Sequence, residues 1–111
     1  FIFGVPIATM IGSGFVPIRK PGKLPSKKIT KEYALEYGTD RLEMHVDAVG
    51  PKDRVLIVDD LLATGGTAGA ACELVRSTGA TVVGAVFLIE LAFLEGRTKL
   101  EGLPIHSLLT Y

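Results

Sequence analysis

The sequence predicts an α/β domain built on a parallel β-sheet flanked by helices. Residues 55–59 and 81–89 are almost continuously apolar runs, as expected of strands buried on both faces of such a sheet. Residues 67–78, between them, place apolar side chains on one helical face, and Gly79 follows where a helix cap belongs. The order strand, helix, strand is the crossover unit of parallel sheets. The 111 residues suffice for one domain, residues 1–111, with one hydrophobic core.

Shorter elements flank this unit. Residues 5–13 predict a helix that begins near Pro6 and ends at one of two glycines, and residues 15–18 predict a short buried strand. Toward the end of the chain we expect a short helix near residues 94–100 and a last strand near residues 105–108.

A basic loop and a β-hairpin are predicted between the first helix and the sheet. Residues 19–32 hold two prolines and a glycine and have no apolar period, which indicates a loop. Residues 33–37 and 41–48 alternate apolar and polar side chains around residues 38–40, the pattern of a hairpin with a three-residue turn. The loop carries six cations before its first acid: Arg19, Lys20, Lys23, Lys27, Lys28 and Lys31. In a neutral chain this favours a basic flexible lid, residues 19–48, that closes over a polyanion.

Nucleic acid is the competing partner of this loop, since lysine-rich loops also bind phosphate backbones. The rest of the chain does not favour it. Twelve basic residues balance twelve acidic ones, and neither an aromatic stacking platform nor a recognition helix accompanies the loop. We therefore expect no nucleic acid and no membrane surface as partners. A plain solvated surface is the alternative for Lys27, Lys28 and Lys31.

The apolar start of the chain predicts a buried helix. A signal peptide is disfavoured because a basic leader and a cleavage site are missing, and the run is too short to span a bilayer. Cys72 is the one cysteine, which fits a reducing, cytoplasmic location, and we expect it to be a buried core residue. His45 and His106 have no metal-ligand spacing around them, so no protein metal site is predicted.

The stretch VLIVDDLLATGGT, residues 55–67, carries the strongest functional signal. It leads from a predicted strand into a predicted helix, where parallel sheets bind ligands. Gly65 and Gly66 allow backbone N–H groups to converge at a helix N-terminus, and Thr64 and Thr67 add hydroxyl donors, so one phosphate would fit. The stretch lacks the Gly-Lys-Ser/Thr of nucleoside-triphosphate loops and the G-x-G-x-x-G of dinucleotide folds.

Asp59 and Asp60 complete this stretch. Neighbouring strand side chains point to opposite faces, so the two carboxylates have different roles. Carboxylates accept hydrogen bonds, and a vicinal diol offers two donors. A ligand that joins a phosphate to a sugar diol, such as ribose 5-phosphate, would satisfy the glycines and the aspartates together. A divalent-metal site and an ordinary polar strand end are the alternatives.

Three motifs in order, IRKPGKLP, YALEYG and VLIVDDLLATGGT, resemble those of the type I phosphoribosyltransferases, and within them the adenine phosphoribosyltransferase family. The resemblance runs along essentially the whole chain. It implies that family's fold and transfer of 5-phosphoribosyl from phosphoribosyl pyrophosphate to adenine, giving AMP and pyrophosphate. It also implies purine salvage, a homodimer, and Mg²⁺ bound mainly through phosphoribosyl pyrophosphate.

The resemblance assigns roles residue by residue. Glu36 matches the catalytic glutamate, and Tyr37 stands beside it in the lid. The other matching positions are Arg19, Lys20 and Lys23 for the pyrophosphate, Asp59 and Asp60 for the ribose hydroxyls, Ala63, Thr64, Gly65, Gly66 and Thr67 for the 5-phosphate, and Leu91 for the base.

Ala63 bears on the choice of base. The 6-oxopurine relatives usually place an aspartate there, suited to managing a proton on their base, so alanine favours adenine. Because other relatives with alanine accept other bases, xanthine, hypoxanthine and uracil are alternatives. A regulator that senses phosphoribosyl pyrophosphate without catalysis is another, although Glu36 and the basic lid favour an enzyme.

Family members begin well before the residue that matches Phe1. The first sheet strands, a pyrophosphate-binding loop and the hood over adenine are missing from the matched chain. The resemblance therefore covers a partial domain, with only one wall of the base pocket. A structural fragment without activity is the third alternative.

Overall fold

The structure, a computed structural model, describes residues 3–19, 28–35, 38–45 and 47–111. Its elements in chain order are α1 (Gly4–Ile11), β1 (Lys28–Leu35), β2 (Gly38–His45), β3 (Arg54–Leu62), α2 (Gly66–Arg76), β4 (Thr81–Glu90), the 3-10 segments η1 (Ala92–Leu94) and η2 (Gly96–Leu100), and β5 (Ile105–Thr110).

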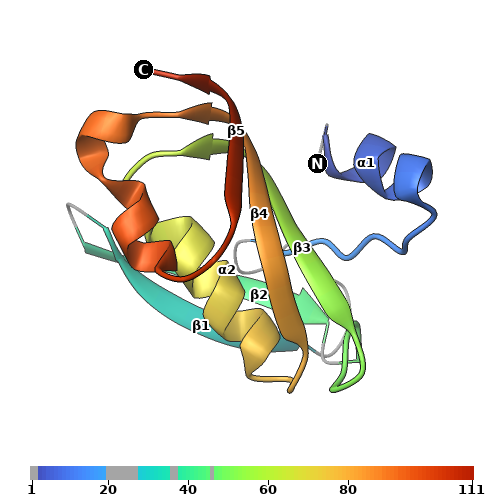
Figure 1. Ribbon diagram of the computed structural model, residues 1–111. Helices are drawn as coiled ribbons and strands as arrows, with labels where there is room; N and C mark the ends of the chain where they lie inside the picture. The colour runs from blue at the N-terminus through green and yellow to red at the C-terminus, as the bar shows by residue number, and fades with distance from the viewer. Residues whose placement is uncertain (1–2, 20–27, 36–37, 46) are drawn as a thin grey trace.

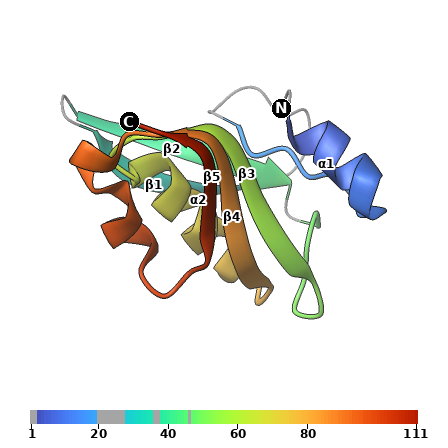
Figure 2. The same ribbon diagram turned by 45° about the horizontal axis from the view of Figure 1, so that its top comes forward.

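The predicted parallel sheet is confirmed. β3, β4 and β5 are hydrogen-bonded in that order, with Val58 opposite Val86 and Val86 opposite His106. α2 supplies the crossover between β3 and β4, and it lies between the sheet and the β1–β2 hairpin (Figure 1). The views of Figures 1 and 2 both place α1 on the β3 side of the sheet.

The core forms where α2 meets the sheet and the hairpin. Its most deeply buried large side chains come from four different elements: Phe87, Met44, Leu62, Val75 and Cys72. The predicted burial of residues 55–59 on both faces of the sheet is wrong, because Leu56 is 36% exposed. β3 is an edge strand of the three-stranded sheet, so its side chains have fewer neighbours than those of the central strand β4.

Two predictions around the basic loop are corrected. Residues 15–18 form no strand. This stretch is irregular, although Val16 and Ile18 pack on the core, and the first strand-like contact is an isolated bridge between Arg19 and Glu43. The predicted loop 19–32 also extends too far, because β1 already begins at Lys28. Backbone pairing with β2 forms this strand without the apolar alternation on which the prediction relied.

The predicted three-residue turn is also wrong. Gly38, Thr39 and Asp40 belong to β2, where they pair with Leu35, Ala34 and Tyr33 in an antiparallel register. Alternation alone does not fix this register, because the turn geometry contributes equally to it. Leu42 and Met44 are buried, as their shared strand face predicts.

The helix ends differ modestly from expectation. α1 ends before Gly12, whose φ of 71° is the left-handed conformation of a helix cap. α2 ends at Arg76, and Gly79 lies beyond it in the following turn, where its N–H donates to the Arg76 carbonyl. The segment near residues 94–100 forms two short 3-10 turns instead of one helix. Within the described residues, no helix is long and apolar enough to cross a membrane.

Cys72 is a core residue, as predicted. It is 2% exposed, and burial raises the pKa of its thiol because the thiolate is disfavoured away from water. We expect Cys72 to react with iodoacetamide more than about tenfold more slowly in the native protein than in urea at the same pH. Mass spectrometry of the alkylated chain measures both rates, and similar rates in the two states would contradict the burial.

Candidate functional site

The loop from β3 into α2 forms an open helix start. We call residues 63–67 the glycine loop. Gly65 has a φ of 86°, and the first α-helical hydrogen bond runs from the Gly69 N–H to the Gly65 carbonyl, 2.8 Å away. The N–H groups of residues 66–68 precede that bond, so they take no part in the α-helical hydrogen bonding, and the helix dipole favours an anion at such a helix start. The Gly66 N–H donates to the Thr64 hydroxyl oxygen, with 3.4 Å between nitrogen and oxygen.

The glycine loop is in backbone contact with η2. A Cβ placed on Gly65 would collide with the carbonyl oxygen of Gly96, and one placed on Gly96 would lie 2.5 Å from the Ala63 carbonyl oxygen. Both Gly65 and Gly96 are buried. Two segments far apart in the sequence thus approach each other more closely than side chains would permit.

Asp59 and Asp60 lie near the carboxyl end of β3, which ends at Leu62, directly before the glycine loop. Asp59 is half-buried and Asp60 is exposed, as expected of neighbours on a strand. The Asp60 N–H donates to Asp59 Oδ1 at 2.9 Å. Burial raises the pKa of the Asp59 carboxyl, and the negative charge of Asp60 adds to this effect.

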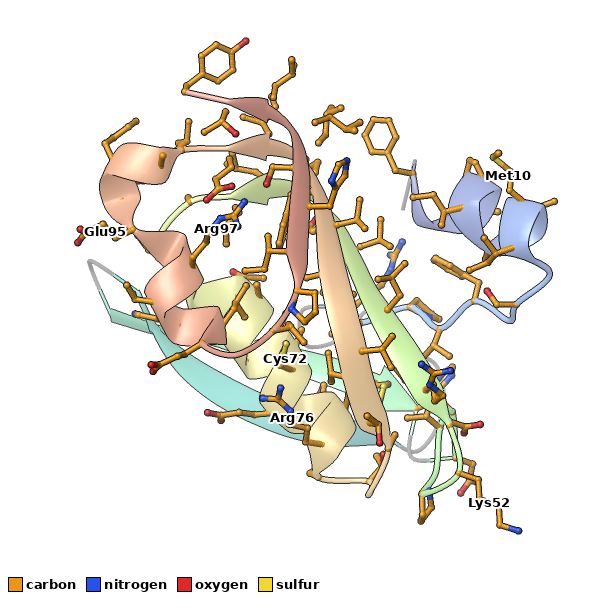
Figure 3. All side chains as sticks on the ribbon, viewed as in Figure 1. Met10, Lys52, Cys72, Arg76, Glu95 and Arg97 are labelled. Carbon is orange, nitrogen blue, oxygen red and sulfur yellow. The ribbon has the colours of Figure 1, made fainter. Side chains whose placement is uncertain are left out.

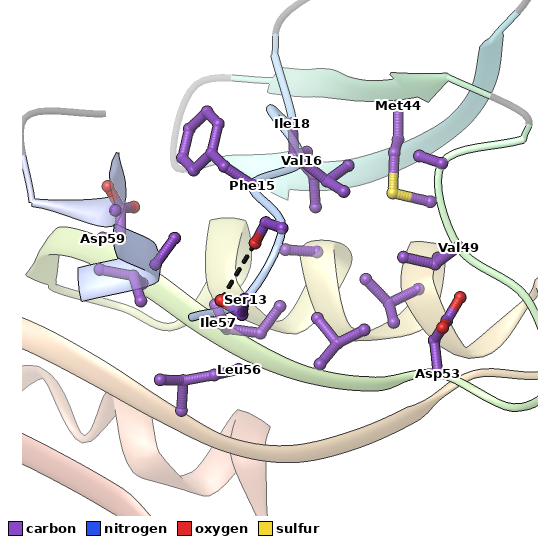
Figure 4. Close-up of a pocket in the computed structure, with 18 of the residues that line it drawn as sticks. Ser13, Phe15, Val16, Ile18, Met44, Val49, Asp53, Leu56, Ile57 and Asp59 are labelled. Atoms are coloured by element: carbon purple, nitrogen blue, oxygen red, sulfur yellow. Dashed lines mark hydrogen bonds between the residues drawn. The ribbon is translucent and has the colours of Figure 1, made fainter. Parts of the chain in front are cut away.

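Asp59 also faces a cavity of about 610 Å³ between α1 and the sheet (Figure 4). The cavity is lined by residues of α1, of the irregular segment after it, of β2, of β3, of the connection between β2 and β3, and of α2, with one residue of β4. Thr67 and Ala68, which border the helix start, are among them. The half-buried carboxylate of Asp59 and the last residue of the glycine loop, Thr67, therefore line the same cavity.

The raised pKa of Asp59 affects the free energy of unfolding. Because its folded-state pKa lies above the ordinary value of 3.8, ionised Asp59 costs folding free energy at neutral pH, and this cost disappears as pH falls below 3.8. Asp59→Asn should therefore raise the free energy of unfolding at pH 7, and the gain should shrink as pH falls. Urea unfolding of both proteins between pH 7 and 3 measures this. A variant less stable at pH 7 would contradict it.

Leu91, the residue directly after β4, lies at the same edge of the sheet. It is half-buried, and its N–H donates to the Leu62 carbonyl at 2.9 Å, beside the pairing of Leu62 with Glu90. The structure therefore brings together the predicted sugar positions Asp59 and Asp60, the predicted phosphate positions Ala63, Thr64, Gly65, Gly66 and Thr67, and the predicted base position Leu91.

Arg19 lies elsewhere. Its backbone exchanges two hydrogen bonds with Glu43 of β2, at 2.8 and 2.6 Å, which ties the start of the basic loop to the hairpin. The predicted positions Lys20, Lys23, Glu36 and Tyr37 lie outside the described residues. Over the part of the chain that the structure describes, no group of three His, Cys, Asp or Glu side chains is arranged to hold a metal ion.

A buried polar cluster at the same edge was missed by the sequence reasoning. Glu90, the last residue of β4, is 4% exposed and receives two hydrogen bonds from Arg97 and one from Ser107. The hydrogen bonds from Arg97 are the main reason why the pKa of Glu90 is lowered. The available signal was an acid that directly ends an apolar strand, followed by an arginine within one short segment.

A parallel sheet whose strands end at an open helix start and an aspartate pair has the arrangement of α/β domains that bind ligands beyond the carboxyl ends of their strands. Comparison with known proteins agrees: residues 19–101 match the family described as phosphoribosyl transferase domain. The chain belongs to this family.

Individual relatives are more specific. The adenine phosphoribosyltransferase of Desulfitobacterium hafniense is 58% identical over the whole chain, which covers 64% of that protein. The crystal structure of the Thermoanaerobacter pseudethanolicus adenine phosphoribosyltransferase is also 58% identical and superposes with a TM-score of 0.97, again over all of this chain and 64% of that one.

A third relative was solved with ligands. The Saccharomyces cerevisiae adenine phosphoribosyltransferase, complexed with an imino-altritol bisphosphate and adenine, is 44% identical with a TM-score of 0.91, over 97% of this chain and 61% of that one. The predicted fold is confirmed by these superpositions. The chain spans just under two thirds of the length of these relatives.

Proposed function

We propose that the protein transfers 5-phosphoribosyl from phosphoribosyl pyrophosphate to adenine, giving AMP and pyrophosphate. One observation carries the proposal: the aspartate pair, the glycine loop at the open start of α2 and Leu91 meet at one edge of the sheet. Relatives with 58% identity are named for this reaction.

The glycine loop would bind the 5-phosphate. The N–H groups at the start of α2 that precede the first α-helical hydrogen bond, and the hydroxyls of Thr64 and Thr67, are donors, and a phosphate has only acceptors to offer at neutral pH. Asp59 and Asp60 would accept hydrogen bonds from the ribose hydroxyls. The carboxylates then bind the hydroxyls of the ribose ring and the backbone N–H groups bind the phosphate, so the carboxylates need not lie against the negative phosphate.

The reaction breaks the bond between C1 of the ribose and the pyrophosphate oxygen and forms a bond from C1 to a purine nitrogen. Positive charge develops on the ribose ring in between, and carboxylates beside the ring stabilise it. Bound Mg²⁺, held mainly by the pyrophosphate and sugar oxygens, would neutralise the leaving group. The oxygen ligands that Mg²⁺ prefers are also those that the strand ends offer, so Asp59 and Asp60 are compatible with the ion.

The lid, residues 19–48, would cover the reacting groups. Arg19, Lys20 and Lys23 would face the pyrophosphate, and a closed lid would keep water from the reacting carbon. Glu36, with Tyr37 beside it, would stabilise the developing cation or handle a proton on the purine. We also propose a homodimer and a cytoplasmic enzyme of purine salvage. The resemblance of the sequence motifs implies the homodimer and purine salvage, and a single cysteine that is buried as a free thiol fits a reducing compartment.

The test is a product assay on this protein. Phosphoribosyl pyrophosphate and Mg²⁺ are supplied with adenine, hypoxanthine, xanthine or uracil, and nucleotides are separated by chromatography. We expect AMP and equimolar pyrophosphate with adenine, and at least about 100-fold slower product formation with the other bases. Preference for another base would contradict the adenine assignment, and binding of phosphoribosyl pyrophosphate without any product would favour a regulator.

A further inference from the structure

We propose that Glu90 and Arg97 form a positioning device for the glycine loop. Their ion pair would hold the backbone of Gly96 against the rear of the loop and so fix the geometry of the proposed 5-phosphate site. The ligand's identity rests on the proposed function, whereas the mechanical claim about the loop stands on contacts among described residues.

The start of η2 packs directly against the glycine loop. Gly96 is buried at the start of η2, with room for no side chain toward Ala63, Leu62 or Gly65. Because Gly65 is equally restricted toward the Gly96 carbonyl, the two backbones form a rigid contact. A shift of η2 would therefore change the support behind the N–H groups at the start of α2.

The ion pair between Arg97 and Glu90 holds Gly96 in place. Its neighbour Arg97 donates from Nε to Glu90 Oε2 at 2.7 Å and from Nη2 to Glu90 Oε1 at 2.8 Å. Figure 3 shows the Arg97 side chain extending from η2 toward the strand ends. A two-pronged pair of this kind fixes orientation as well as distance.

The backbone just before Gly96 is strained, which agrees with a contact imposed from outside. Glu95 has a φ of 54°, in the left-handed region that costs a residue with a side chain about 1–2 kcal/mol. Such a conformation persists where the surroundings determine it. Before Glu95, its own N–H donates to the Ala92 carbonyl at 3.0 Å and ends η1; after it, the backbone contact of Gly96 and the Arg97 ion pair hold the chain.

Glu90 links this device to all three strands of the sheet. It ends β4, pairs with Leu62 of β3, accepts from the Ser107 hydroxyl of β5 at 2.8 Å, and its backbone carbonyl accepts from the Tyr111 N–H at 2.9 Å. Leu91, the proposed base contact, follows it directly. The Glu90 carboxylate is therefore connected both to the glycine loop, through Arg97 and Gly96, and to Leu91, its neighbour in the chain.

Hydrogen exchange of the protein without ligand tests the device. The Gly69 N–H bonds to the Gly65 carbonyl and the Leu91 N–H to the Leu62 carbonyl, so both report on this edge, whereas Val75 lies in the last turn of α2. In Arg97→Ala we expect exchange at Gly69 and Leu91 to rise at least about tenfold relative to Val75. Arg97→Lys keeps the positive charge but loses the two-pronged hydrogen bonding of the guanidinium. Its exchange rates at Gly69 and Leu91 should lie between those of Arg97→Ala and those of the wild type.

The matched control is Lys99→Ala, which removes an exposed cation from the same segment η2 and should leave all three exchange rates unchanged. Equal acceleration at Gly69, Leu91 and Val75 in Arg97→Ala would mean that the ion pair contributes only to global stability, and it would overturn the inference. So would unchanged exchange at Gly69 and Leu91.

Binding of phosphoribosyl pyrophosphate with Mg²⁺, measured by calorimetry below the unfolding temperature, provides the functional readout. Arg97→Ala should weaken it about tenfold while Lys99→Ala does not. If the wild-type protein binds no phosphoribosyl pyrophosphate, the proposed function fails, and the exchange rates still decide the positioning role.

Discussion

Gly65→Ala should both destabilise the fold and abolish binding of the proposed sugar phosphate. The residue has a φ of 86°, and its new methyl group would meet the Gly96 carbonyl oxygen of a buried backbone. Left-handed strain costs about 1–2 kcal/mol, and forced overpacking adds about 1–3 kcal/mol. We therefore expect the free energy of unfolding to fall by roughly 2–4 kcal/mol in urea titrations. Binding of ribose 5-phosphate should be lost at temperatures where the variant stays folded.

Gly69→Ala is the matched control on the same helix. Its methyl group would lie 3.6 Å from the Lys99 carbonyl oxygen, an ordinary van der Waals contact. Alanine in a helix is favoured over glycine by about 0.5–1 kcal/mol, so this variant should be at least as stable as the wild type and bind unchanged. Equal losses in the two variants would contradict the role assigned to the contact between Gly65 and Gly96.

Replacing both Asp59 and Asp60 with asparagine should weaken binding of phosphoribosyl pyrophosphate with Mg²⁺ by at least about 100-fold. Each hydrogen bond to a charged group contributes roughly 1.5–3 kcal/mol, and asparagine retains one neutral acceptor where the carboxylate had two charged ones. Calorimetry measures the change. Because the Asp59 change alone should stabilise the fold at pH 7, the loss is distinguishable from unfolding.

Asp53→Asn provides the comparison, since Asp53 precedes the amino end of the same strand. Its Oδ2 accepts from the Gly50 N–H at 2.8 Å in a turn remote from the carboxyl ends of the strands. Asparagine can make the same kind of hydrogen bond, so binding should not change. Unaltered binding in the double variant of Asp59 and Asp60 would contradict the sugar-diol role.

Local signals made half of the site predictable. The crossover of β3, α2 and β4 follows from two apolar runs with a helical period between them, and the glycines of the loop mark its turn into the helix. Asp59 and Asp60 occupy opposite faces because strand geometry requires it. These features depend on residues close together in the sequence, so the sequence alone determines them.

The rest depends on contacts between distant segments. The register that pairs Gly38 with Leu35 is a choice among alternatives that the same alternation permits. The closed contact of Gly65 with Gly96 and the Glu90–Arg97 pair exist because η2 folds back on the strand ends, and short 3-10 turns have no apolar period that reveals their position.

The most direct test of the ribose-phosphate site is a titration of isotope-labelled protein with ribose 5-phosphate, followed by amide NMR shifts. The ligand lacks the pyrophosphate and the base, so it addresses only the glycine loop and the aspartates. We expect the largest saturating shifts at the amides of Gly65, Gly66 and Thr67, with smaller ones at Asp59 and Asp60. Shifts confined to the lysines of residues 20–31, or none at the start of α2, would contradict the assignment.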